Sequence, residues 1–121
     1  MADLVTERRG VPVLLCAADG PPVAGAADAV DLIGASFDRA DVIAVPVERL
    51  HPDFFALRTG VAGDIVQKFV NYRKQLAVVG DISAAVAGST ALRDLVTESG
   101  RGGSGGVWFV ADLTELDERL A

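Results

Sequence analysis

Short, continuous runs of apolar residues alternate along the chain with stretches in which apolar residues recur at helical spacing. The runs are rich in β-branched residues and carry few polar ones, which is typical of strands covered on both faces of a sheet. They span residues 11–17, 41–47, 76–80 and 107–111. Buried strands that alternate with helices favour a mostly parallel sheet with helices packed against it. This alternation therefore predicts an α/β fold.

Two further features complete the expected order of elements. A weaker strand at residues 3–7 precedes a turn at residues 8–10, and would form an antiparallel hairpin with the first apolar run. Four helices are expected after it, and Ser89 and Asp112 are good N-cap residues for the last two. The order is then ββαβαβαβα in a single domain over residues 1–121. The four buried stripes are Ala29, Leu32, Ile33 and Phe37; Ala62, Ile65, Phe69 and Tyr72; Leu92, Leu95 and Val96; and Leu113, Leu116 and Leu120.

Composition narrows the classes of function. The chain has 121 residues, of which 50% are hydrophobic, so it is able to bury one core. Its net charge of -6 disfavours binding to nucleic acid and to anionic membranes, because both repel an acidic surface. No apolar run approaches the ~20 residues that span a bilayer. We therefore expect a cytoplasmic protein that binds neither nucleic acid nor membrane.

Residues associated with catalysis are few and poorly placed. The glycine-rich stretch at residues 100–106 contains G-x-G-x-x-G and G-x-S-x-G by letter, but both motifs function between a strand and a following helix. Here a helix is expected before the stretch and a strand after it. His51 is the only histidine, and Cys16, the only cysteine, is expected to be buried and unreactive. The sequence therefore predicts no catalytic residues, no metal site and no cofactor.

One cluster of polar and small residues is expected where the parallel strands end. Ligands of open α/β sheets bind at this edge. An arginine and a helix N-terminus there would suit an anionic ligand. The alternative is that these residues only form turns, a surface ion pair and close packing contacts. The cluster comprises Glu48, Arg49, Thr59, Gly60, Gly63, Asp81 and Ser83.

Aromatic residues near the same edge are candidates for a protein interface. Phe54 and Phe55 fall outside both periodic patterns. They either fold back over the sheet edge, where Leu50 and Leu57 would complete a local cluster, or form an exposed apolar patch for a partner. Tyr72, at the end of the following helix, is the third residue assigned to this interface.

Five segments of the sequence are distinctive: PVERL, DFFxLxTGxAGxIxQKFxNYR, LAVVGDIS, ALRDLVTES and VWFVADLTEL. Together they closely resemble the uncharacterised bacterial domain-of-unknown-function family 4180. The resemblance covers nearly the whole chain and is most specific over residues 46–83. That family has no established activity, so the resemblance implies no particular function.

The expected layout also resembles the STAS domains (sulfate transporter and anti-sigma-factor antagonist), which share the N-terminal hairpin and the alternating helices and strands. In the anti-sigma antagonists, a serine or threonine at the start of the helix after the central strand is phosphorylated, and the added charge switches binding to a partner. The matching position is Thr59. The usual Asp-Ser pair is missing, and the preceding loop at residues 51–58 is long.

Two functions from different classes remain open at this point. The first is a non-enzymatic regulatory or protein-binding module, which would meet a protein partner through the loop after residues 41–47 and the helix expected from Thr59 to Tyr72. The second is a small-molecule binding protein or small enzyme with an anionic ligand at the strand edge. A homodimer is also possible, because a mean hydropathy of +0.36 is high for a small monomer.

Overall fold

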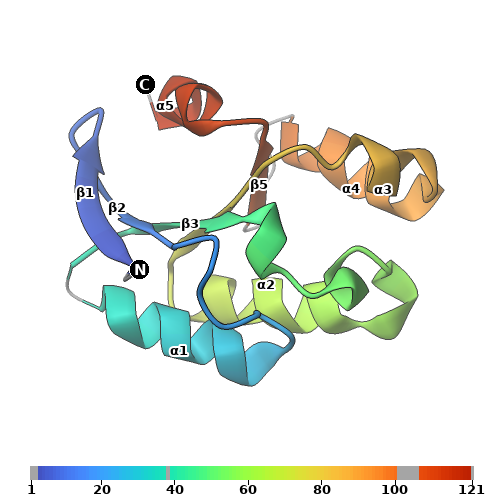
Figure 1. Ribbon diagram of the computed structural model, residues 1–121, viewed down its shortest axis with the longest axis horizontal. Helices are drawn as coiled ribbons and strands as arrows, with labels where there is room; N and C mark the ends of the chain where they lie inside the picture. The colour runs from blue at the N-terminus through green and yellow to red at the C-terminus, as the bar shows by residue number, and fades with distance from the viewer. Residues whose placement is uncertain (1–2, 38, 101–106, 121) are drawn as a thin grey trace.

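The computed structural model describes residues 3–37, 39–100 and 107–120, and a five-stranded sheet forms its centre (Figure 1). The strands are β1 (Leu4–Arg8), β2 (Val11–Leu15), β3 (Val42–Pro46), β4 (Gln75–Val79) and β5 (Val107–Val110). They lie side by side in the order of the sequence. β1 runs antiparallel to β2, and the other neighbours are parallel. The mostly parallel sheet with an N-terminal hairpin is therefore confirmed.

Helices cover both faces of this sheet. They are α1 (Ala26–Ser36), α2 (Val61–Asn71), α3 (Ser83–Ala87), α4 (Thr90–Gly100) and α5 (Leu113–Leu120), and the 3₁₀ turns η1 (Val47–Arg49), η2 (Pro52–Phe54) and η3 (Leu57–Thr59) connect β3 to α2. α1 and α2 lie against one face and α5 against the other (Figure 1). α4 packs on β5 beside the edge of the sheet.

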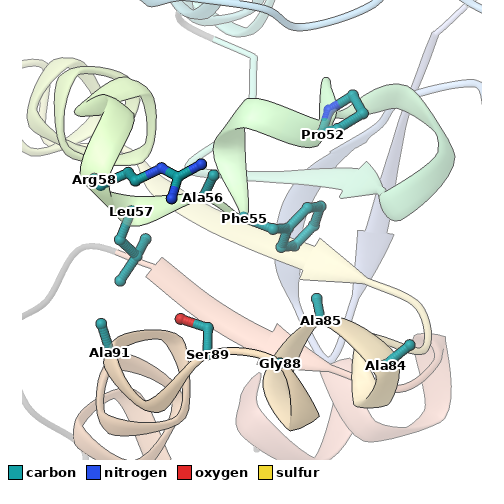
Figure 2. Close-up of a pocket in the computed structure, with 10 residues that line it drawn as sticks. All are labelled: Pro52, Phe55, Ala56, Leu57, Arg58, Ala84, Ala85, Gly88, Ser89 and Ala91. Carbon is teal, nitrogen blue, oxygen red and sulfur yellow. The ribbon is translucent and has the colours of Figure 1, made fainter.

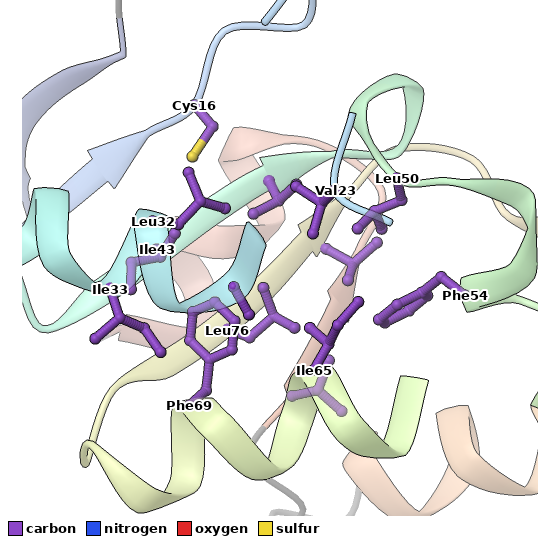
Figure 3. Close-up of a cluster of buried hydrophobic side chains, with 14 of the residues drawn as sticks. Cys16, Val23, Leu32, Ile33, Ile43, Leu50, Phe54, Ile65, Phe69 and Leu76 are labelled. Carbon is purple, nitrogen blue, oxygen red and sulfur yellow. The ribbon is translucent and has the colours of Figure 1, made fainter. Parts of the chain in front are cut away.

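The larger hydrophobic core lies between the sheet and the α1–α2 layer (Figure 3). β3 supplies Ile43 and Val45 to this core, and Phe69 of α2 is buried in it. The alternate β3 residues, Val42 and Ala44, belong to a smaller core on the opposite face, which α5 covers. Because successive strand residues point to opposite faces, a strand buried on both sides needs the continuous apolar run seen in the sequence.

The N-terminal hairpin and α5 close the smaller core together. Arg8 of β1 pairs with Asp117 of α5, with Nε 2.5 Å from Oδ1 and Nη2 2.9 Å from Oδ2. The hydrogen bonds from Arg8 hold the pKa of Asp117 below its ordinary value. The two ends of the described chain are therefore joined across this face.

Both N-caps expected from the sequence are confirmed. Ser89 Oγ accepts a hydrogen bond from the backbone N–H of Leu92 at 3.1 Å. Asp112 Oδ1 accepts one from the backbone N–H of Glu115 at 2.9 Å. Each cap satisfies a backbone donor that the first turn of its helix would otherwise leave unpaired.

The expected order of elements is wrong in one place. Two helices, α3 and α4, lie between β4 and β5 where one was expected, so ββαβαβαβα omits α3. α3 has five residues, too few to display helical periodicity. The buried stripes of the first two helices also end early, because Phe37 and Tyr72 lie beyond the helix ends and are 60% and 49% exposed.

α2 ends in a backbone motif that usually contains glycine. The N–H of Lys74 donates to the carbonyl oxygen of Phe69 at 2.8 Å, and the N–H of Arg73 donates to that of Val70 at 3.1 Å. These two bonds form a Schellman motif. Arg73 has a φ of 58°, in the left-handed region, where a side chain costs roughly 1–2 kcal/mol. The fold thus keeps an arginine where glycine would be more favourable.

We expect Arg73→Gly to stabilise the protein by about 0.5–1 kcal/mol, because the relief of left-handed strain exceeds the backbone entropy that glycine loses on folding. Urea unfolding followed by circular dichroism measures the change. Lys68→Gly, inside α2, is the control and should destabilise by about 1 kcal/mol. A lower free energy of unfolding for Arg73→Gly would contradict the strain argument.

Candidate functional site

The residues of the expected strand-edge site occupy three separate local settings. Glu48 and Arg49 belong to η1, Thr59 and Gly60 precede α2, Gly63 lies in the first turn of α2, and Asp81 and Ser83 lie at the start of α3. The side-chain contacts of each group determine what it is able to offer a ligand.

Arg49 is a buried cation with structural contacts, and is only 6% exposed. Nε donates to the carbonyl oxygen of Pro21 at 2.7 Å. Nη1 donates to Asp3 Oδ1 at 2.8 Å and to the carbonyl oxygen of Ala17 at 3.2 Å. These contacts tie η1 to the N-terminal segment and to the loop after β2, so Nε and Nη1 are committed inside the fold.

The segment around Arg49 is shaped to hold the guanidinium. A Cβ atom at Gly20 would overlap Cζ of Arg49, so any other residue at this position would displace the guanidinium. Asp3 Oδ1 also accepts a hydrogen bond from the backbone N–H of Ala17 at 2.9 Å. Arg49, Asp3 and Gly20 therefore form one interlocked unit.

Thr59 is exposed, and its hydroxyl is used locally. Oγ1 lies within donating distance of the carbonyl oxygens of Asp53 (2.9 Å) and Ala56 (2.8 Å). It also accepts a hydrogen bond from the backbone N–H of Val61 at 3.3 Å. These bonds close the turns before α2 and cap its first turn. Phosphorylation of Thr59 stays a prediction.

Asp81 and Ser83 are brought together, but in a turn. Asp81 Oδ1 accepts a hydrogen bond from the backbone N–H of Ser83 at 2.9 Å. Hydrogen bonds from the Ser83 side chain and backbone lower the pKa of Asp81 below its ordinary value. Asp81 and Glu48 are both exposed to solvent. These contacts agree with the alternative prediction, in which Asp81 and Ser83 only form a turn.

A larger surface feature lies between the 3₁₀ turns and helices α3 and α4 (Figure 2). There, residues 52–58 face residues 84–91 across a hollow of about 490 Å³ with mostly apolar walls. No sequence pattern indicated this hollow, because α3, which supplies part of the second wall, is too short to show helical periodicity. The lining residues are Pro52, Phe55, Ala56, Leu57, Arg58, Ala84, Ala85, Gly88, Ser89 and Ala91.

A second hollow, of about 540 Å³, lies between α2 and α4. Leu57 lines both hollows, and we refer to them together as the interhelix groove. α2 packs against α1 and β4, whereas α4 packs against α3 and β5, so the space between α2 and α4 stays open. The other lining residues of the second hollow are Gly60, Ala62, Gly63, Val66, Gln67, Val70 and Leu95.

The interhelix groove offers apolar surface with a single charged group. Val70 is 44% exposed there, and Phe55 and Leu57 are partly buried. Arg58 is the only charged lining residue, and its side chain forms no hydrogen bond or ion pair within the described chain. Such a surface suits the burial of apolar side chains from a partner, with one carboxylate beside them.

Of the three aromatic residues assigned to an interface, Phe55 lines this groove. Phe54 is fully buried in the larger core with Leu50 (Figure 3). It therefore folds back over the sheet edge and does not form part of an exposed interface. Its ring meets that of Phe55 edge to face, with centroids 5.2 Å apart. Tyr72 is exposed at the opposite end of α2.

The structure also describes Cys16, the side chains of types that bind metal ions, and the length of the helices. Cys16 is 7% exposed, and burial raises the pKa of its thiol to about 12, with a smaller increase from Asp3 and an opposing effect of Arg49. Among residues 3–37, 39–100 and 107–120, no group of three or more His, Cys, Asp or Glu side chains is placed to hold a metal ion. No helix in these ranges has the length and apolar character to cross a membrane. Residues 101–106 of the glycine-rich stretch lie outside the described residues.

Comparison with known proteins gives a family and no activity. The family model described as "Domain of unknown function (DUF4180)" matches residues 8–120. No curated protein and no solved structure matches the chain. The function therefore has to be argued from the geometry.

Replacing Arg49 tests its structural role. We expect Arg49→Met to destabilise the protein by about 2–3 kcal/mol, because it leaves the Asp3 carboxylate without its cationic partner. The Asp3 side chain is 23% exposed, so water offsets part of this loss. Glu48→Ala, at the exposed neighbour, should change the free energy of unfolding by less than about 0.5 kcal/mol. Chemical denaturation of the two variants measures both values, and equal stabilities would refute the structural role.

Proposed function

The chain belongs to the domain-of-unknown-function family whose model spans residues 8–120, and we propose that it is a non-enzymatic regulatory module that binds a protein partner in the interhelix groove. One observation carries the proposal: the groove joins two hollows with apolar walls and contains one cation, Arg58, that has no ion pair or hydrogen bond among the described residues. Monomeric proteins seldom leave apolar surface of this kind uncovered without a binding role.

The groove suits a protein segment better than a small molecule. Small-molecule pockets are also mostly apolar, but they enclose most of the ligand and carry a few precisely placed polar groups that fix its orientation. Here the walls are mostly alanine, glycine and aliphatic side chains, and the hydroxyl of Ser89 caps α4. The strand edge gives the anionic-ligand alternative little support, because Arg49 is committed to Asp3 and Pro21.

We expect the partner to present an amphipathic helix with an acidic residue beside its apolar face. Helix-in-groove recognition uses apolar side chains at i, i+3, i+4 and i+7. Gly60, Gly63 and the alanines of α3 leave room for a backbone to approach closely. A carboxylate on the partner would form the charge-assisted pair that Arg58 does not make within the described part of the chain.

A photo-crosslinking residue at Ala91, in the α4 wall, should capture this partner in cells of the source organism. The same residue at Ala35, which is exposed on α1 outside the groove, is the control. With the purified partner, Val70→Glu should reduce affinity at least about tenfold, because it places a charge in an apolar interface. Val30→Glu, at the 37% exposed valine of α1, should not. Equal affinities for the two valine variants would exclude the groove as the docking surface.

We further propose that phosphorylation of Thr59 regulates this binding. In the anti-sigma antagonists among the STAS domains, whose layout the sequence resembles, the matching position is phosphorylated. Thr59 is exposed between Arg58 and Gly60, which both line the groove. A phosphate there would lie at the N-terminus of α2 and would replace the hydroxyl bonds to residues 53 and 56.

Incubation with kinases of the source organism and intact-mass analysis should show one phosphate on the wild type and none on Thr59→Ala. The modified protein should bind the captured partner with an affinity changed at least about tenfold. An unmodified Thr59, or unchanged affinity after modification, would refute the regulation while leaving the groove proposal intact.

A further inference from the structure

A third hollow lies at the other end of the sheet, where the parallel strands begin. Its volume is about 310 Å³, and we call it the amino-end hollow. Phe37, Arg39 and Asp41 line it from the segment after α1, and Tyr72 and Lys74 line it from the segment after α2. It shares no lining residue with the interhelix groove.

Two aromatic side chains of this hollow are open to solvent. Phe37 is 60% exposed and Tyr72 is 49% exposed, although both continue the apolar stripe of their helix. They come from different helices and border the same small space. Exposed aromatic faces are platforms on which a planar ring stacks.

The charged groups of the hollow are partly held in place. Lys74 Nζ donates to the carbonyl oxygen of Ala40 at 2.6 Å and lies 5.9 Å from the centroid of the Phe37 ring. An ammonium group has three donors, so this contact fixes the cation and leaves donors for a ligand. The Arg39 side chain is exposed and has no hydrogen bond or ion pair within the described residues.

Asp41 adds an acceptor on a fixed backbone. Its N–H donates to the carbonyl oxygen of Pro12 at 3.1 Å, and its carbonyl oxygen accepts from the N–H of Gln75 at 2.9 Å. Its exposed carboxylate has no partner within the described residues. A carboxylate accepts hydrogen bonds from hydroxyl or amino groups of a ligand.

We propose that the amino-end hollow binds a free mononucleotide. The base stacks on Tyr72 and Phe37, the phosphate is held by Lys74 and Arg39, and Asp41 accepts a hydrogen bond from a ribose hydroxyl. A mononucleotide combines the planar ring, the anion and the hydroxyl donors that these five side chains would recognise. The volume is at the lower end of small-molecule sites, and the net charge of -6 disfavours a polyanionic nucleic acid.

Arg73 supports the same assignment from the backbone. It lies between Tyr72 and Lys74 and keeps a further exposed cation in this segment, at a φ of 58° that favours glycine. Residues held in strained backbone conformations cluster at functional sites, and Arg73 stands directly beside two lining residues of the hollow without lining it itself.

Titration of the full chain with adenosine 5′-monophosphate, followed by amide NMR, tests the proposal. We expect saturable shifts concentrated at residues 37, 39–41 and 72–74. Adenosine alone and inorganic phosphate alone should each bind at least about tenfold more weakly, because each lacks either the ionic or the stacking contacts. Absence of saturation at concentrations on the order of 10 mM, or an equal response to phosphate alone, would overturn the proposal.

Variants locate the binding on the named side chains. Tyr72→Leu and Arg39→Gln should each weaken binding of the nucleotide at least about fivefold, through lost stacking and lost charge. Val30→Leu and Arg93→Gln are matched controls, because they change an exposed apolar residue of α1 and an exposed arginine of α4, both outside the hollow. Equal losses in the controls would also overturn it. Neither test variant lines the interhelix groove, so the outcome is independent of partner binding.

Discussion

The strand order, which follows the sequence without reversal, determines where the helices lie. Crossovers between neighbouring parallel strands are right-handed, so successive connections that advance in one direction place their helices on the same face. The connections from β2 to β3 and from β3 to β4 therefore share one face of a narrow sheet. α1 and α2 occupy it over the larger core, and α4 packs at the edge on β5. The interhelix groove is the space that remains between α2 and α4, and only α5, after the last strand, covers the other face.

The same order removes the crevice in which open α/β sheets usually bind ligands. That crevice forms where the strand order reverses and adjacent loops diverge to opposite faces. β2 to β5 advance in one direction, and the polar residues at their carboxyl ends stabilise the connections instead. Arg49 holds the loop after β2, Thr59 caps α2, and Asp81 closes the turn before α3. The open apolar and aromatic surface is consequently found beside and at the ends of the helices.

The predictable parts of the fold are those with a local cause in the sequence. Doubly buried strands require continuous apolar runs, and the caps at Ser89 and Asp112 bond within three residues. The missed parts depend on distant or very short segments. Arg49 and Asp3 are 46 residues apart in the chain, so no local sequence pattern indicates that they form a pair. α3 is a short helix without helical periodicity in its sequence, so the second wall of the groove was not predicted. Phe37 and Tyr72 continue a helical stripe by spacing, but each helix ends before them.

The last turn of α2 connects the two surfaces proposed for binding. Val70 borders the interhelix groove, and Tyr72, two residues later, borders the amino-end hollow. Arg73 follows directly, in a backbone conformation that already carries strain. A ligand that stacks on Tyr72 and alters this turn would change the position of Val70 as well, and the strained residue makes this turn a favourable place for such an adjustment. If both surfaces are occupied in the cell, the two affinities are linked. The factor by which the nucleotide changes the affinity for the partner then equals the factor by which the partner changes the affinity for the nucleotide. The protein would then respond to a small molecule as well as to a partner, because the two surfaces meet at the carboxyl end of α2.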